Sequence, residues 1–109
     1  MKLRKRDHDF ITKTAMPYFG IKELMVKWDN STKKYPDIWV DLSNRPPQIS
    51  VTREWARQGE IERKKRIVHE LLHVRGMEHD DAIGYSTYPD KDTYSMNVYK
   101  HMITTRSRY

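Results

Sequence analysis

The sequence contains no cysteine, which excludes disulfide bonds and thiolate metal ligands. Any metal ion would therefore have to be held by His, Asp or Glu. Only five residues are Asn or Gln, whereas Lys and Glu are abundant, a composition typical of proteins from thermophiles. There is also no internal repeat, low-complexity segment or linker, so we expect one domain over the 109 residues.

Long hydrophobic runs are missing as well. No stretch approaches the roughly 18 apolar residues that a membrane span needs, and the opening MKLRKRDHDF lacks the apolar segment of a signal peptide. We therefore expect a soluble, cytoplasmic protein with no membrane partner. Hydrophobic residues make up 37% of the chain, which is enough for a small core.

Acidic residues are outnumbered by basic ones, and the formal net charge is +6. Such a charge suits nucleic acids or acidic partners through long-range attraction. It is spread along the chain, however, and only Lys2–Arg6 and Arg63–Arg66 form compact basic runs. We interpret both runs as solvated surfaces, and nucleic acid is not the partner that we favour.

The hydrophobic pattern predicts an α+β fold with an N-terminal helix, a small three-stranded sheet, a long helix and a C-terminal helix. The first helix is expected from Asp7 or Asp9 to Phe19, with an acidic cap and with Gly20 as its stop. The last helix is expected from about Asp92 to Ile103.

Three short stretches between these helices are rich in β-forming residues. They are IKELMVKWD at 21–29, DIWVDL at 37–42 and QISVTREW at 48–55. Because a turn-like segment joins the first two, we expect them to pair as an antiparallel hairpin. Gln48–Trp55 is expected to add the third strand.

The best-defined helix is predicted from about Glu60 to Arg75, with Gly76 directly after it. At about 100° per residue, its apolar side chains share an arc of roughly 140°. They are Ile61, Ile67, Val68, Leu71 and Leu72. His69 and His73 lie beside this arc, so both should border the core.

The end of this helix begins the stretch HELLHVRGMEHD at 69–80, which holds three of the five histidines. His69 and His73 are four residues apart, so both imidazoles lie on one side of the helix, about one turn apart. Such a pair of nitrogens suits zinc. Glu70 lies too far round the helix to join them as a ligand, but it could accept a proton from a metal-bound water.

Gly76 provides a route to a third ligand. Glycine adopts positive φ readily, so the chain could turn there and bring His79 back to the same ion. Three protein ligands would leave a fourth coordination position open for water, as catalytic zinc requires. Asp80 could orient a ligand histidine through its second ring nitrogen, or it could cap a turn.

HELLH at 69–73 resembles the HExxH signature of the zincin metallopeptidases, and its extension through Asp80 is similar to the longer metzincin form. The small size and the order of elements resemble the minigluzincins, which are very small soluble archaeal peptidases. The resemblance implies a minimal zincin-like catalytic domain over residues 1–109, with Zn²⁺ as its cofactor. It implies that Glu70 is the catalytic base and that the metal ligands are His69, His73 and His79.

The same families suggest other roles. In gluzincins the third ligand usually comes from a downstream helix, where His101 is the matching candidate. Metzincins carry a methionine turn below the metal, a part that Met96 could play unless it is a packed helix residue. Minigluzincins are latent through their C-terminal segment, which implies an inhibitory role for Thr104–Tyr109. A tyrosine could stabilise the oxyanion, and the candidates are Tyr85, Tyr88, Tyr94 and Tyr99.

The predicted function is that of a zinc metalloendopeptidase acting on peptides or proteins. An extended substrate would pair with a sheet edge, for which Gln48–Trp55 is the candidate. One alternative is a zinc-dependent endoribonuclease of the kind that matures ribosomal RNA, which has the same histidine spacing but glycine in place of Glu70. The carboxylate at Glu70 favours peptide hydrolysis. Another alternative is a small metal-binding module without catalysis.

Overall fold

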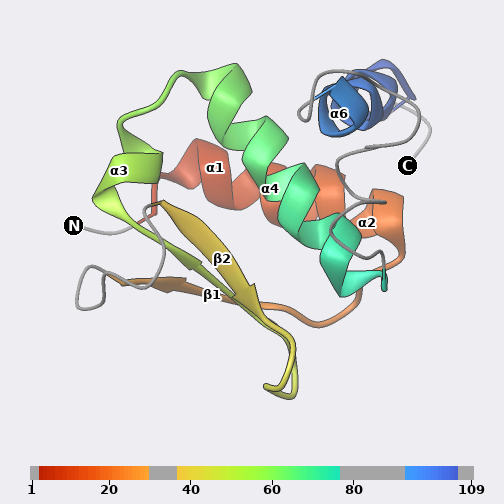
Figure 1. Ribbon diagram of the computed structural model, residues 1–109. Helices are drawn as coiled ribbons and strands as arrows, with labels where there is room; N and C mark the ends of the chain where they lie inside the picture. Colours follow the sequence, from red (N-terminus) through yellow and green to blue (C-terminus); the bar gives the residue numbers. More distant parts are fainter. Residues whose placement is uncertain (1–2, 30–36, 77–92, 106–109) are drawn as a thin grey trace.

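The computed structural model describes residues 3–29, 37–76 and 93–105 (Figure 1). In these ranges a small three-stranded sheet lies beside several helices, which confirms the predicted α+β fold. Helix α4 (Glu60–Val74) runs between strand β2 (Ile38–Asp41) and helix α6 (Thr93–Thr105) in Figure 1, and it contacts both. The face of α4 between these two neighbours is where the candidate site lies.

The N-terminal helix consists of three consecutive segments. They are α1 (Lys5–Asp9), the π-helical η1 (Phe10–Ala15) and α2 (Met16–Phe19). Gly20 ends the helix with φ of 67°, as predicted, and the amide of Ile21 donates to the Met16 carbonyl at 2.9 Å. The predicted acidic cap is wrong, because the helix begins before Asp7 and no side chain caps it.

The sheet differs from the predicted hairpin. Strand β3 (Gln48–Val51) is central: β1 (Met25–Trp28) pairs with it in parallel, and β2 pairs with it in antiparallel orientation. The expected pairing of the first two strands is therefore wrong. Three of the four residues of β3 are buried, whereas β1 alternates exposed and half-buried residues, so the most buried strand takes the position with neighbours on both sides.

The third strand is also shorter than predicted, because it ends at Val51. Thr52 then caps the short helix α3 (Arg53–Ala56) by accepting a hydrogen bond from the amide of Trp55. Trp55 is buried, and its indole donates to the carbonyl of Arg63 at 3.1 Å. The second half of the predicted strand is therefore a helical turn that fastens the sheet to α4.

Helix α4 has the predicted bounds to within one residue, and Gly76 follows with φ of 94°. Most of its predicted apolar face is buried, namely Ile67, Val68, Leu71 and Leu72. Ile61 was expected in this face but is 56% exposed in the first turn. In the same half of the helix, Arg63 and Lys65 are buried instead.

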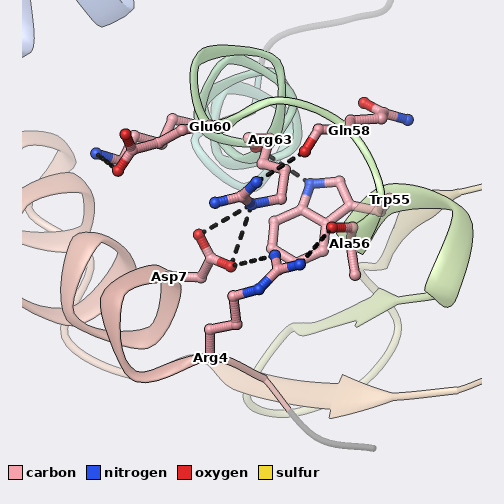
Figure 2. A network of polar contacts seen from close by, with 8 residues as sticks. Arg4, Asp7, Trp55, Ala56, Gln58, Glu60 and Arg63 are labelled. Atoms are coloured by element: carbon pink, nitrogen blue, oxygen red, sulfur yellow. Dashed lines mark hydrogen bonds and ion pairs between the residues drawn. The ribbon is translucent and has the colours of Figure 1, made fainter.

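Arg63 is the centre of a buried polar network that joins α1 to α4 (Figure 2). Its Nε lies 3.2 Å from both carboxylate oxygens of Asp7, and its Nη1 donates to the Gln58 carbonyl at 2.7 Å. Arg4 adds a contact to Asp7 and donates to the carbonyl of Ala56. The interpretation of Arg63–Arg66 as a solvated face is therefore wrong, because Arg63 and Lys65 are used inside the fold.

The C-terminal helix forms where it was predicted. Tyr99 and Met102 of α6 are buried in the core, and Ser95 is buried with them. Thr104 and Thr105 complete this helix, so the expected inhibitory segment begins inside α6, and its last four residues lie outside the described ranges. None of the helices in the described ranges is long and apolar enough to cross a membrane.

Candidate metal centre

His69 and His73 come together on the last turns of α4. Their Nε2 atoms are 3.2 Å apart, the ring centroids are 4.9 Å apart, and the ring planes are nearly perpendicular at 80°. Both side chains are half-buried beside the apolar face, as their position in the sequence predicts. The helix therefore directs one nitrogen from each ring to the same point.

This spacing can be compared with what a zinc ion needs. Zinc–nitrogen bonds of about 2.0–2.1 Å at a tetrahedral angle place two ligand nitrogens roughly 3.3 Å apart. The observed separation of 3.2 Å is close to that value. It also suits one N–H···N hydrogen bond, which can hold the two rings together in the metal-free chain. The pair thus fits zinc as two of its ligands.

Glu70 lies on the side of α4 that faces the start of β2. Burial, and next to it the nearby carboxylate of Asp37, raise the pKa of this carboxyl to about 8, against the opposing effect of the Arg66 guanidinium. A bound cation would act in the same direction as Arg66. Glu70 is therefore a carboxyl that readily takes up a proton near neutral pH, which suits a general base.

Asp37 is held firmly beside Glu70, directly before β2. Its carboxylate accepts hydrogen bonds from the amide of Ile38 at 2.8 Å and from the Gln58 side chain at 3.1 Å. Arg66 adds an ion pair at 2.9 Å. The ion pair with Arg66 fastens Asp37, and with it the start of β2, to α4.

Ser95 is a residue of this site that the sequence pattern did not indicate. Its Oγ lies 3.2 Å from Nδ1 of His69, and the residue is only 1% exposed. It comes from α6, 26 positions further along the chain, so no spacing rule within one helix could find it. His69 is thus contacted from a second helix.

Several predicted site residues lie outside the described ranges. These are His79, Asp80, Tyr85 and Tyr88. Of the other two candidate tyrosines, Tyr94 belongs to α6, and Tyr99 packs its ring against Phe10 with centroids 6.0 Å apart. Within the described part of the chain, no group of three His, Asp or Glu side chains could hold a metal ion. A third protein ligand would have to come from the remaining residues.

His101 does not join the pair. Its Nδ1 lies 2.8 Å from the hydroxyl of Tyr18, the two rings form an edge contact, and the side chain is exposed. The alternative that places His101 as third ligand is therefore wrong for this arrangement. Met96 lies within α6 and packs against the core, so the methionine-turn interpretation is also wrong.

The predicted substrate edge must be corrected too. Strand β3 has β1 on one side and β2 on the other, so its backbone groups are already paired. Among the described strands β2 pairs with β3 alone, and β2 contacts α4. The sheet edge next to the site is therefore that of β2.

Comparisons with protein-family models, with curated proteins and with solved structures found no match to this chain. The residues of the site are therefore the only guide to what this chain does.

Proposed function

We propose that this protein is a zinc-dependent peptidase of the zincin type. The observation that carries the proposal is the convergence of His69 and His73, with Nε2 atoms 3.2 Å apart. Glu70, which follows His69 in the chain, has a pKa raised to about 8. In this arrangement His69 and His73 would hold the ion, with His79 as the proposed third ligand. We also propose that the protein resembles the minigluzincins, which would account for its small size.

Zinc, when bound, would supply a Lewis acid that polarises the scissile carbonyl and favours ionisation of water. Glu70 then provides the proton transfers. Its carboxylate accepts a proton from the attacking water and passes it to the nitrogen of the leaving amine. The buried environment favours the protonated form of Glu70, so the carboxylate is a stronger base than an exposed glutamate.

A peptide substrate would lie along the outer edge of β2. Peptides commonly bind in extended form along the edge of a sheet, through backbone hydrogen bonds. Asp37 precedes this strand and lies beside Glu70, so a peptide on this edge would pass close to the proposed base. With β2 in place of β3, the expected substrate lies on the strand that contacts α4.

The ribonuclease alternative is less well supported. It draws on the net charge of +6, yet Arg63 and Lys65 are buried in ion pairs with Asp7 and Glu62. These cations do not contribute to a binding surface for phosphates. A carboxyl at Glu70 also has no counterpart in that family.

The experiment compares wild type, Glu70→Gln and Glu62→Gln with zinc added, using casein and a structured RNA as substrates. Glu62 is the matched control because it lies on the same helix and pairs with Lys65 at 2.7 Å. We expect casein hydrolysis to fall by about 10²–10⁴-fold in Glu70→Gln and to persist in Glu62→Gln. Equal casein rates in wild type and Glu70→Gln, or cleavage of RNA alone, would refute the proposal.

The same assay tests latency. The test uses a truncated variant. Because α6 extends to Thr105, this variant should end at Thr105, so that only residues 106–109 are removed. Faster hydrolysis by the shorter chain is expected if the C-terminal segment inhibits the enzyme. Equal rates would exclude inhibition by these four residues.

A further inference from the structure

We propose that Ser95 is a positioning residue that selects the tautomer of His69 needed for metal binding. This inference rests on the proposed function, because it assumes that His69 binds metal through Nε2. Its basis is the contact of 3.2 Å between Ser95 Oγ and His69 Nδ1, at a position where Ser95 is 1% exposed. Ser95 belongs to α6, so the proposal gives that helix a part in the metal centre.

The chemistry follows from the imidazole ring. A neutral histidine carries one N–H, and its other nitrogen keeps the lone pair that a metal needs. If Nδ1–H of His69 donates to Ser95 Oγ, the lone pair is on Nε2, which is the atom that faces His73. Ligand histidines commonly donate their second N–H to such an acceptor, and this contact fixes the orientation of the ring.

The position of Ser95 is set by packing. Tyr99 and Met102, one and two turns further along α6, are buried in the core, and α6 contacts both α4 and η1. The serine hydroxyl is therefore presented by a packed helix, which holds it more rigidly than a loop would. His69 should consequently be oriented before any metal binds.

The two histidines then differ in the metal-free chain. With the lone pair of His69 on Nε2, a hydrogen bond across the 3.2 Å separation is donated by Nε2–H of His73. His69 is thus already in the metal-binding tautomer, whereas His73 has to move its proton to Nδ1 when the metal binds. This asymmetry can be observed without any enzymatic assay.

The test measures zinc affinity by competition with a chromophoric chelator for wild type, Ser95→Ala, Ser95→Thr and Ser50→Ala. Ser50 is the matched control, because it is also a serine that is 1% exposed, and it lies in β3. We expect Ser95→Ala to bind zinc about 10- to 100-fold more weakly, whereas Ser50→Ala should equal wild type. Ser95→Thr, which keeps the hydroxyl, should recover most of the affinity.

A second measurement covers the case in which a variant folds poorly. Long-range ¹H–¹⁵N spectra of the metal-free wild type should show His69 with its proton on Nδ1 and His73 with its proton on Nε2. A His69 proton on Nε2, or equal zinc affinity of Ser95→Ala and wild type, would overturn the inference and leave the proposed peptidase intact. Zinc binding that depends on Ser95 without any hydrolysis would instead support the inference and refute the peptidase.

Discussion

Helix α4 has a buried charged side chain in its first half and a half-buried carboxyl in its second half, and the two groups differ in how they are compensated. In the first half, Arg63 is 6% exposed and meets Asp7, which is 2% exposed, together with the carbonyl of Gln58. In the second half, Glu70 faces Asp37, another carboxylate, and burial raises its pKa to about 8. The first arrangement satisfies its charges, whereas the second keeps a carboxyl in surroundings that disfavour its ionised form.

This difference separates a structural role from a functional one. A buried ion pair with additional hydrogen bonds fastens α1 to α4 and needs no ligand. A titratable group with a strongly shifted pKa, next to two converging imidazoles, is typical of active sites. We therefore expect substitutions in the first half to lower stability, and substitutions in the second half to affect metal binding.

The largest effect on stability is expected for Arg63→Met. It leaves the buried carboxylate of Asp7 without its main partner, so the free energy of unfolding should fall by about 3–5 kcal/mol. Urea denaturation measures the change, with Arg57→Met as a control at an exposed arginine. The double variant Asp7→Leu/Arg63→Met should recover much of the loss, because no buried charge is left without its partner. An unchanged midpoint for Arg63→Met would contradict the structural role of this half.

An intermediate effect is expected for zinc on the second half. At a free concentration of 100 times its Kd, zinc should raise the free energy of unfolding by about 2.7 kcal/mol in the wild type. His69→Ala and His73→Ala should lose this gain, as shown by thermal unfolding with zinc and with chelator. His8→Ala, at a histidine side chain that is 58% exposed, should keep it. Equal zinc stabilisation of all four proteins would place the metal elsewhere.

The smallest effect is a gain in stability for Glu70→Gln without metal. The folded state binds the Glu70 proton more tightly than the unfolded chain, so wild-type stability should fall as pH rises from 4.5 through about 8. Glutamine removes this loss, and partial exposure and Arg66 limit the gain to about 1–2 kcal/mol above pH 8. Urea denaturation at both ends of this range measures it. A variant less stable than wild type at high pH would show that the ionised carboxylate supports the fold.

The parts of the molecule that the sequence predicted are local in the chain. The period of about 3.6 residues places α4 and brings His69 to His73, because both features depend only on residues one turn apart. Gly20 and Gly76 end their helices with positive φ for an equally local reason.

The parts that could not be predicted depend on distant contacts. Strand pairing depends on which strand the core buries most. The partner of β1 is therefore β3, and not β2, which follows β1 in the chain. Arg63 meets a partner 56 residues away, and His69 meets Ser95 across 26. Neither pairing leaves a periodic pattern in the sequence. The predicted ligand His79 lies outside the described residues.

The most direct test of the account is a crystal structure of the zinc-loaded protein with anomalous diffraction at the zinc edge. We predict one strong peak at about 2.0–2.1 Å from Nε2 of both His69 and His73, and its remaining ligands would show whether His79 binds. A peak at another location, or no peak in crystals grown with excess zinc, would contradict the claim that these histidines form a metal centre.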